Sequence, residues 1–133
     1  MKTAIMLAAA LTVLSLAAPA AAAPRSRDFE AGPIWNQQDA EVKCPIVASA
    51  VRGRWNGNWV TTRWNEMSVC GVEGARRFAL RRETPVEVGP IWNQDDAQLK
   101  CPVAAAALRA VWNGHWWTTR EGQMSVCALI PRV

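Results

Sequence analysis

The chain contains two closely similar stretches in tandem. Residues 32–70 read GPIWNQQDAEVKCPIVASAVRGRWNGNWVTTRWNEMSVC, and residues 89–127 read GPIWNQDDAQLKCPVAAAALRAVWNGHWWTTREGQMSVC. Each position of the first stretch aligns without a gap with the position 57 residues later, since 89 minus 32 and 127 minus 70 give the same offset. Such a match indicates two copies of one supersecondary unit. Because the shared residues include loop motifs as well as apolar positions, we expect a binding site in each copy.

The segment before the repeats has the composition of a secretory signal peptide. Lys2 is followed by an apolar run over residues 4–18 and then by an alanine cluster. We predict a signal peptide over residues 1–22, because cleavage after Ala22 avoids placing Pro24 directly after the scissile bond. The apolar run is short for a membrane-spanning helix, and no later segment qualifies. We therefore expect an exported chain, secreted or periplasmic, with no membrane span.

The signal peptide, the two copies and the segment between them divide the chain into four parts. These are the signal peptide at 1–22, a first repeat at 23–75, an arginine-rich linker at 76–87 and a second repeat at 88–133. Removing Lys2 from the 15 basic residues leaves 14, against 11 acidic ones. The linker arginines are Arg76, Arg77, Arg81 and Arg82. We interpret them as a solvated face, because export and a modest net charge argue against a nucleic-acid partner.

The four cysteines follow the repeat, since Cys44 and Cys70 correspond to Cys101 and Cys127. Identical units should form identical internal contacts, so we predict the disulfides Cys44–Cys70 and Cys101–Cys127 rather than bridges between copies. Each would close a loop of about 27 residues and contribute roughly 3 to 4 kcal/mol in the chain-entropy model. A zinc site is the competing interpretation, but the sequence has no Cys-x-x-Cys pair and an oxidising compartment favours disulfides. We expect no metal and no cofactor.

One copy has the pattern of a short strand, a helix and a hairpin. Residues 55–63 are rich in aromatic and β-branched side chains, a turn is expected near Asn65, and a second apolar run covers residues 67–72. The sheet of this hairpin would receive the helix on one face, which predicts an α+β fold of two tandem β-α-β-β units. The sequence leaves open whether the two copies pair their sheets across residues 74–87.

We predict that the helix of the first copy begins at Asn36, whose side chain can cap it, with Asp39 reaching back in a capping-box arrangement. Val42 and Ile46 lie four residues apart and predict an apolar face. Pro45 interrupts this pattern, so either a kink or a fresh helix start is expected, and the continuous apolar phase favours the kink. The second copy repeats these features at Asn93, Asp96, Leu99, Val103 and Pro102.

The chain has eight tryptophans and no tyrosine, and six of the eight occupy equivalent positions in the two copies. The pairs are Trp35 with Trp92, Trp55 with Trp112, and Trp59 with Trp116. By strand alternation the second pair faces the helix, and we interpret it as core. The other two pairs lie in loops or bends beside Asn, Gln and Thr, where an indole offers an apolar surface to a sugar ring and amides bind its hydroxyls. Burial as bulk is the alternative, but the combination indicates a carbohydrate ligand.

An Asn-Gly pair precedes the bend tryptophan in each copy, at Asn56-Gly57 and at Asn113-Gly114. Such pairs form turns or strand bulges, and a glycine also lets a ligand approach the backbone closely. Two residues beyond the bend tryptophans, Thr61 and Thr118 lie on the same strand face as the indoles. They either extend the polar floor of a site or merely suit a strand.

In these motifs the chain resembles the MVL-type mannan-binding lectins. The resemblance rests on residues 31–36, on the Asp-Ala helix start with its proline and alanines, on residues 56–61 and on Met67-Ser68-Val69, each recurring in the second copy. It covers nearly the whole predicted mature chain. It implies an α+β fold with one glycan site per copy, recognising branched mannose with the chitobiose core of oligomannose. The family's Thr-Gly-Gln-Trp bend is replaced here by Asn56-Gly57-Asn58-Trp59 and Asn113-Gly114-His115-Trp116.

The resemblance also implies which residues contact the glycan, in the loop before the helix and in the bend. In the first copy these are Gly32, Pro33, Trp35, Asn36, Asn56, Gly57, Asn58, Trp59 and Thr61. In the second copy they are Gly89, Pro90, Trp92, Asn93, Asn113, Gly114, His115, Trp116 and Thr118.

A glycosidase is the main alternative function. Hydrolysis needs two carboxyl groups at a defined separation, or one acid assisted by the acetamido group of the substrate. Asp95, which replaces Gln38 of the first copy, would permit weak cleavage of β-1,4-linked N-acetylglucosamine in the second copy only. The simpler interpretation is that Asp95 favours the helix N-terminus electrostatically. A cell-wall glycan-binding or protein-interaction role is a third class, and self-association into a homodimer stays open, because the sequence determines no oligomeric state.

Overall fold

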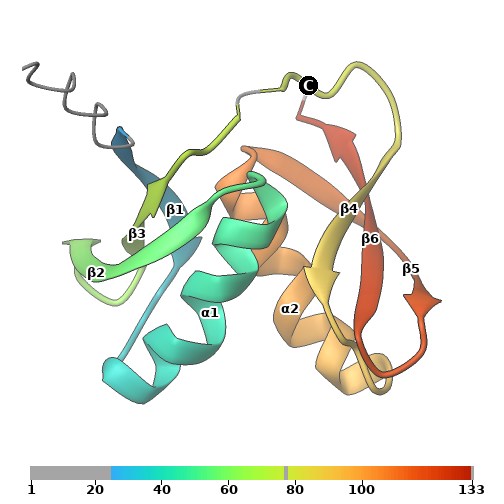
Figure 1. Cartoon of the computed structure of the whole chain (residues 1–133), viewed down its shortest axis with the longest axis horizontal. Coiled ribbons are helices and arrows are strands. Elements are labelled where there is room, and N and C mark those ends of the chain that lie inside the picture. Colours follow the sequence, from blue (N-terminus) through green and yellow to red (C-terminus); the bar gives the residue numbers. More distant parts are fainter. Residues whose placement is uncertain (1–24, 77, 133) are drawn as a thin grey trace, which may run out of the picture.

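The computed structural model describes residues 25–76 and 78–132, so the predicted signal peptide at residues 1–22 lies outside the described residues. The first repeat consists of β1 (Ser26–Gly32), α1 (Gln37–Ala50), β2 (Arg54–Arg63) and β3 (Met67–Glu73). The second consists of β4 (Thr84–Gly89), α2 (Gln94–Ala107), β5 (Ala110–Arg120) and β6 (Met124–Pro131). This order confirms the predicted pair of β-α-β-β units (Figure 1). Because β4 begins at Thr84, the last part of the 76–87 segment belongs to a strand of the second repeat.

Each repeat forms its own antiparallel three-stranded sheet, with the strand order β1-β3-β2 in the first and β4-β6-β5 in the second. The hairpin predicted around Asn65 is β2–β3, and the first strand of the repeat adds to it beside β3. The two sheets are not hydrogen-bonded to each other in the part of the chain that the structure describes. The sequence left open whether the two repeats pair their sheets, and the structure shows two separate sheets.

The helix caps agree with the prediction in one half of the capping box and differ in the other. The Asn36 side chain accepts a hydrogen bond from the Asp39 amide at 2.9 Å, as a helix N-cap should. The Asp39 carboxylate, however, accepts from the amide of Trp35 at 3.1 Å rather than from that of Asn36. The predicted box is therefore shifted by one residue, which ties the helix to the preceding loop. The helix also continues through Pro45 to Ala50, so a fresh start at the proline is excluded.

The predicted apolar helix face is wrong at one position in each repeat. Val42 is 46% exposed and Leu99 is 50% exposed, whereas Ile46 and Val103 are buried. The buried arc is centred on the helix cysteines, which lie against the middle strand of each sheet. Val42 lies two residues from Cys44, about 200° around a helix of 3.6 residues per turn, and therefore faces outward.

The two predicted disulfides are confirmed. Cys44 bonds to Cys70 with an S–S distance of 2.04 Å, and Cys101 bonds to Cys127 at 1.99 Å. Each bridge joins the helix of a repeat to the middle strand of its own sheet, and all four sulfurs are fully buried. No helix within residues 25–76 and 78–132 has the length and apolar character needed to cross a membrane.

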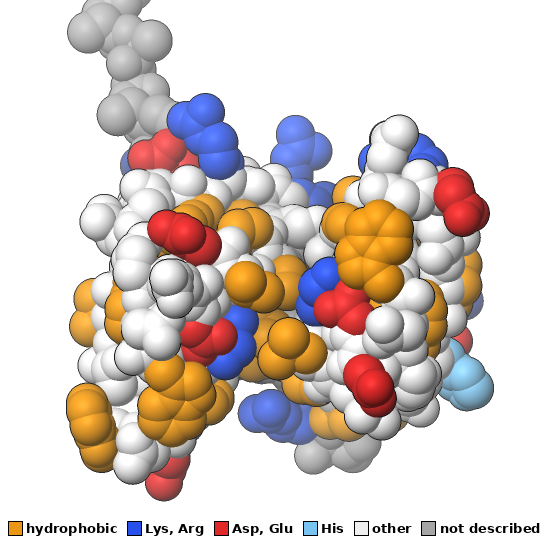
Figure 2. All heavy atoms as spheres, turned by 90° about the horizontal axis from the view of Figure 1, so that it is seen from below, with side chains coloured by type: hydrophobic (Ala, Val, Ile, Leu, Met, Phe, Trp, Pro, Cys, Tyr) orange, Lys and Arg blue, Asp and Glu red, His pale blue; other side chains and the backbone are white. Residues whose placement is uncertain are grey.

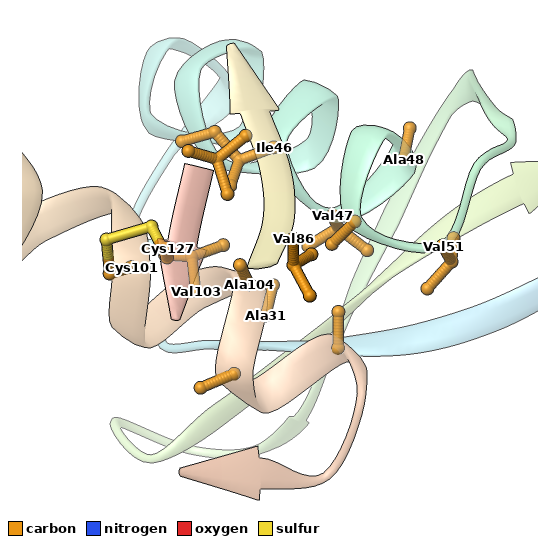
Figure 3. Packing of buried hydrophobic residues seen from close by; sticks show 14 of the residues in the cluster. Ala31, Ile46, Val47, Ala48, Val51, Val86, Cys101, Val103, Ala104 and Cys127 are labelled. Carbon is orange, nitrogen blue, oxygen red and sulfur yellow. A yellow bond between two sulfur atoms is a disulfide. The ribbon is translucent and has the colours of Figure 1, made fainter. Parts of the chain in front are cut away.

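The repeats meet through their helices, which pack against each other between the two sheets (Figure 1). Each helix also contacts the first strand of the other repeat, α1 lying against β4 and α2 against β1. Val86 of β4 and Val47 of α1 both belong to the resulting core, which is continuous across both repeats (Figure 3). The Ser49 hydroxyl completes the seam by donating to the Glu87 carbonyl at 2.8 Å. Seen from below, the repeats form two lobes with a furrow between them (Figure 2).

Candidate functional site

The loop between the first strand and the helix is held by a buried lysine. Lys43 is 8% exposed, and its Nζ donates to the Pro33 carbonyl at 2.7 Å and to the Asp39 carboxylate at 2.9 Å. The same carboxylate accepts from the Trp35 amide, so both ends of the loop are anchored to the first turns of α1. The Trp35 side chain itself is 61% exposed. The ordered backbone of this loop thus presents an exposed indole to solvent. Because the loop is already ordered, it loses little conformational entropy when a ligand binds.

The second repeat builds its loop in the same way. Lys100 donates to the Pro90 carbonyl at 2.6 Å and to the Asp96 carboxylate at 2.8 Å. Asp96 accepts from the Trp92 amide at 3.0 Å, and the Trp92 side chain is 67% exposed. Neither lysine was among the predicted site residues. The signal was present in the sequence, since Lys43 and Lys100 lie four residues after the two aspartates, at the spacing of a helical ion pair.

A buried serine joins this loop to the hairpin. The Ser68 hydroxyl is 1% exposed, accepts from the Ile34 amide at 3.2 Å and lies 3.2 Å from the Thr61 hydroxyl. Ser125 repeats these contacts with Ile91 at 3.2 Å and with Thr118 at 3.1 Å. The predicted threonines therefore belong to a polar floor, and the serines beneath them are residues that the sequence analysis did not assign to the site.

The bend tryptophans are fixed at one edge by the helix. The Trp59 indole is partly buried against the core, and its Nε1 donates to the Gln37 Oε1 at 2.9 Å. Trp116 is held in the same way by Gln94 at 2.8 Å. Because the N–H group is already engaged, Trp59 and Trp116 offer a ligand their ring surface rather than a hydrogen bond. Gln37 and Gln94 thus position the indoles, a role that the sequence analysis missed.

These elements surround a depression of about 130 Å³ in the first repeat. Its lining residues are Pro33, Ile34, Trp35, Trp59, Thr61, Arg63, Trp64, Asn65, Glu66 and Ser68. The structure therefore brings together the predicted loop, bend tryptophan and threonine. It adds the β2–β3 turn, in which Trp64 is 82% exposed and Arg63 lies 3.9 Å from Glu66. Trp64 has no equivalent in the second repeat, so a search for paired tryptophans could not select it.

The second repeat has the same arrangement with a different rim. An atom placed at the Cβ position of Gly122, in the β5–β6 turn, would lie 3.8 Å from the Trp92 ring, so the loop tryptophan faces the turn. In this turn Glu121, Gly122 and Gln123 replace Trp64, Asn65 and Glu66. The two sites thus share the lysine-anchored loop and the serine floor, while the rim carries an indole in one and a carboxylate in the other.

The Asn-Gly segments are placed elsewhere. Asn56, Gly57 and Asn58 form a bulge in β2, near the end of the strand opposite the turn that lines the depression. The Asn56 side chain accepts from the Asn58 amide at 2.9 Å and donates to Ser26 at 2.8 Å. Gly57 has φ of +89°, a backbone conformation that favours glycine. These contacts support the bulge interpretation, and none of the three residues lines the depression.

The corresponding segment of the second repeat has the same internal bonds. Asn113 accepts from the His115 amide at 3.0 Å and donates to the Glu83 carboxylate at 2.7 Å. The His115 carbonyl accepts from the Trp112 indole at 2.9 Å, as the Asn58 carbonyl does from Trp55. Trp55 and Trp112 are partly buried against the core, in line with their predicted orientation.

Asp95, the candidate acid of the glycosidase alternative, lies exposed in the first turn of α2. Its neighbour Gln94 holds the bend tryptophan, so Asp95 is close in sequence to the candidate site. Asp96, the next carboxylate, is engaged by Lys100 and by the loop amide. No group of three or more metal-ligating side chains occurs among residues 25–76 and 78–132.

Similarity to known proteins extends over both repeats. A family model described as mannan-binding protein, MVL, matches residues 37–72 and 94–128. The chain is also 38% identical over 105 residues to lectin MVL of Microcystis viridis, an alignment that spans 74% of this chain and 89% of the relative. Both family matches begin at the glutamine that holds the bend tryptophan and include the serine of the polar floor.

Proposed function

Because the chain belongs to the MVL family of mannan-binding proteins, we propose that it is a lectin that binds oligomannose glycans through one site in each repeat. We place each site in the depression between the loop before the helix and the turn of the hairpin. The glycan it recognises is branched mannose together with the chitobiose core. The predicted signal peptide supports secretion or export to the periplasm, where such glycans are accessible.

The observation that carries this proposal is the exposed loop tryptophan beside a hydroxyl-lined floor, present in both repeats. Trp35 offers an apolar ring to the C–H face of a pyranose, and the Thr61 hydroxyl, which lines the same depression, can bind a sugar hydroxyl. The anchored loop keeps the two groups at a fixed separation. Rigid aromatic and hydroxyl groups side by side are the combination that a neutral sugar requires.

The size of the depression favours an extended ligand. Its volume of about 130 Å³ is below the roughly 300 to 1,000 Å³ of pockets that enclose a whole small molecule. One sugar residue would therefore enter, and its neighbours would lie across the rim, over Trp35 and Trp64 in the first repeat. A branched oligosaccharide contacts more of this surface than a free monosaccharide does, which supports recognition of the branch with its core.

The glycosidase alternative rests on Asp95 alone. This exposed carboxylate has no counterpart in the first repeat, where Gln38 takes its place. The nearest carboxylate in sequence, Asp96, anchors the loop and is therefore better explained as a structural group. Cleavage would then require assistance from the acetamido group of the substrate. The family to which the chain belongs favours binding without hydrolysis as its principal activity.

A calorimetric titration with a chitobiose-core oligomannoside tests the proposal. We expect two equivalents bound per chain, falling to one in either Trp59→Ala or Trp116→Ala, since each variant removes the wall of one site. Chitotriose is titrated in parallel, and the recovered ligand is analysed for shortened products. Two equivalents in both single variants would show that the sites are misplaced. Cleavage that disappears in Asp95→Asn would instead favour the enzyme.

A further inference from the structure

A larger cavity, separate from the depression of the first repeat and from the corresponding surface of the second, lies at the seam between the repeats. Its volume is about 400 Å³. The C-terminal end of α1, the segment after β3 and the sheet of the second repeat contribute its walls. The side chains that matter below are Arg52, Phe78, Glu87, Trp117 and Thr119. A volume in this range accommodates a small organic ligand.

Trp117 faces this cavity and not the site of the second repeat. In the β5–β6 ladder, Trp116 pairs with Cys127, which is bonded to α2, whereas Trp117 pairs with Val126 on the other face of the sheet. Side chains alternate along a strand, so Trp116 and Thr118 lie on the face of the sheet toward α2, while Trp117 and Thr119 lie on the other face and line the seam cavity. Glu87 of β4 also pairs with Val126, which places its side chain on the same face as Trp117.

The polar groups of the cavity are free to bind a ligand. Arg52 stacks over the Phe78 ring at 5.1 Å, and it forms no ion pair with another described residue. The Glu87 carboxylate is likewise unpaired within the described part of the chain, because the Ser49 hydroxyl binds the Glu87 backbone carbonyl instead. The Thr119 hydroxyl donates to the Met124 carbonyl at 3.3 Å and can still accept a hydrogen bond.

The arrangement does not recur in the first repeat. Val60 occupies the position equivalent to Trp117 and is 60% exposed. A tryptophan is not required at this place by the fold of the unit, since the first repeat forms the same three-stranded sheet with a valine there. Trp117 nevertheless remains 44% exposed, so it leaves a large ring surface accessible to a ligand.

We propose that the seam cavity is a third saccharide site, which binds one neutral pyranose residue. The ring of Trp117 stacks against the C–H face of the sugar. The Glu87 carboxylate accepts hydrogen bonds from two hydroxyls, and the Arg52 guanidinium donates to hydroxyl or ring oxygens. Glu87 and Arg52 together contribute no net charge, so the cavity has no net attraction for a charged sugar, and its hydrogen-bonding groups suit a neutral one. This site goes beyond the two repeat sites and does not depend on them.

Indole N–H signals in a two-dimensional NMR spectrum can test the third site separately. The signal of Trp117 is the one missing from the spectrum of the Trp117→Val variant. Valine is chosen because the first repeat has it at the equivalent position, Val60. Methyl α-mannopyranoside and N-acetylglucosamine are titrated as probes. We expect the Trp117 signal to shift with at least one of them, following its own saturation curve. The repeat sites are followed separately, at the signals of Trp35, Trp59, Trp92 and Trp116, in a titration with the chitobiose-core oligomannoside, so failure of one proposal is distinguishable from failure of the other.

Trp117 could bind a sugar, or it could only shield Val126 from solvent, and substitutions distinguish these two roles. Trp117→Phe keeps an aromatic cover, while Arg52→Gln and Glu87→Gln leave the cover intact and remove the charges. We expect each charge variant to weaken the Trp117-detected binding by about tenfold, the equivalent of one charge-assisted hydrogen bond. The repeat-site signals should respond as in the unmodified chain. A Trp117 signal that shifts with neither sugar would overturn the proposal. The same holds if both charge variants bind the sugar with the affinity of the unmodified chain.

Discussion

The indole Nε1 of Trp59 donates to the side-chain oxygen of Gln37 at 2.9 Å, across 22 residues of sequence. This bond connects the sheet wall of the first depression to the first residue of α1. Asn36 caps the same helix, and the Asp39 carboxylate accepts a hydrogen bond from the Trp35 amide. Both site tryptophans are therefore hydrogen-bonded to the first turn of one helix. The helix start therefore helps to position both the Trp35 backbone and the Trp59 ring.

Replacing Gln37 by Ala should weaken glycan binding in the first repeat by about three- to tenfold, the equivalent of one neutral hydrogen bond. The Trp59 ring would lose its fixed orientation while the core beneath it stays packed. The matched control is Gln38→Ala, an exposed neighbour for which no side-chain bond is present among the described residues. Calorimetry in a Trp116→Ala background isolates the first site. Equal affinities for the two variants would show that the bond has no positioning role.

Exchanging the rim residues should exchange the properties of the two sites. We expect Trp64→Glu to weaken the first site by up to about tenfold, because an exposed aromatic surface beside the ligand is lost. Glu121→Trp should strengthen the second site by a similar factor. Both affinities are measured by titrating an oligomannoside into chains in which the other site is disabled, by Trp116→Ala for the first site and by Trp59→Ala for the second. If neither exchange alters affinity, the turn does not contact the glycan.

The Lys43 ammonium should be essential for the loop. Lys43→Met keeps the apolar stem but leaves the Asp39 carboxylate without its cation and the Pro33 carbonyl without its donor. We expect a loss of about 2 to 4 kcal/mol in the free energy of unfolding, measured by urea denaturation. Adding Asp39→Asn should recover part of this loss by removing the unpaired charge. A double variant as unstable as the single one would contradict this account.

Removing one disulfide should destabilise the whole chain and not only its own repeat. In the double variant Cys44→Ala with Cys70→Ala, the loss is expected to be about 3 to 4 kcal/mol. Because the core is continuous through both repeats, thermal unfolding should remain a single cooperative transition at lower temperature. The equivalent change at Cys101 and Cys127 is the control and should give a similar shift. Two separate transitions in either variant would show that the repeats unfold independently.

Structural features whose contacts lie within a single repeat were largely predictable from the sequence. The disulfide pairing followed from the equivalence of Cys44 with Cys101 and of Cys70 with Cys127, and the Asn36 cap depended on residues next to it. The seam between the units was not predictable, because a duplicated sequence specifies the same fold twice without specifying its docking. Position 42 was wrong for a different reason, which lies within one unit. The apolar spacing was right, but the buried arc of the helix is centred on Cys44, and Val42 faces away from it.

The candidate site was predicted in part for a similar reason. Trp35, Trp59 and Thr61 were selected by their repetition and chemistry, and they line one depression. Asn-Gly segments have the same composition whether they bind a ligand or shape a strand, and here the Asn56 side chain bonds within the bulge and to Ser26 of β1. Ser68 was overlooked because a serine in the middle of a strand becomes a floor residue only once the loop folds over it.

The reciprocal contact of α1 with β4 and of α2 with β1 has a consequence for the history of the chain. A gene that encoded a single unit would produce a protein with one uncovered helix flank and one uncovered strand. Two such products could cover each other in the arrangement that the linked repeats now adopt. The duplication would then have joined an existing dimer, after which the halves were free to diverge, as the rims at Trp64 and Glu121 have done.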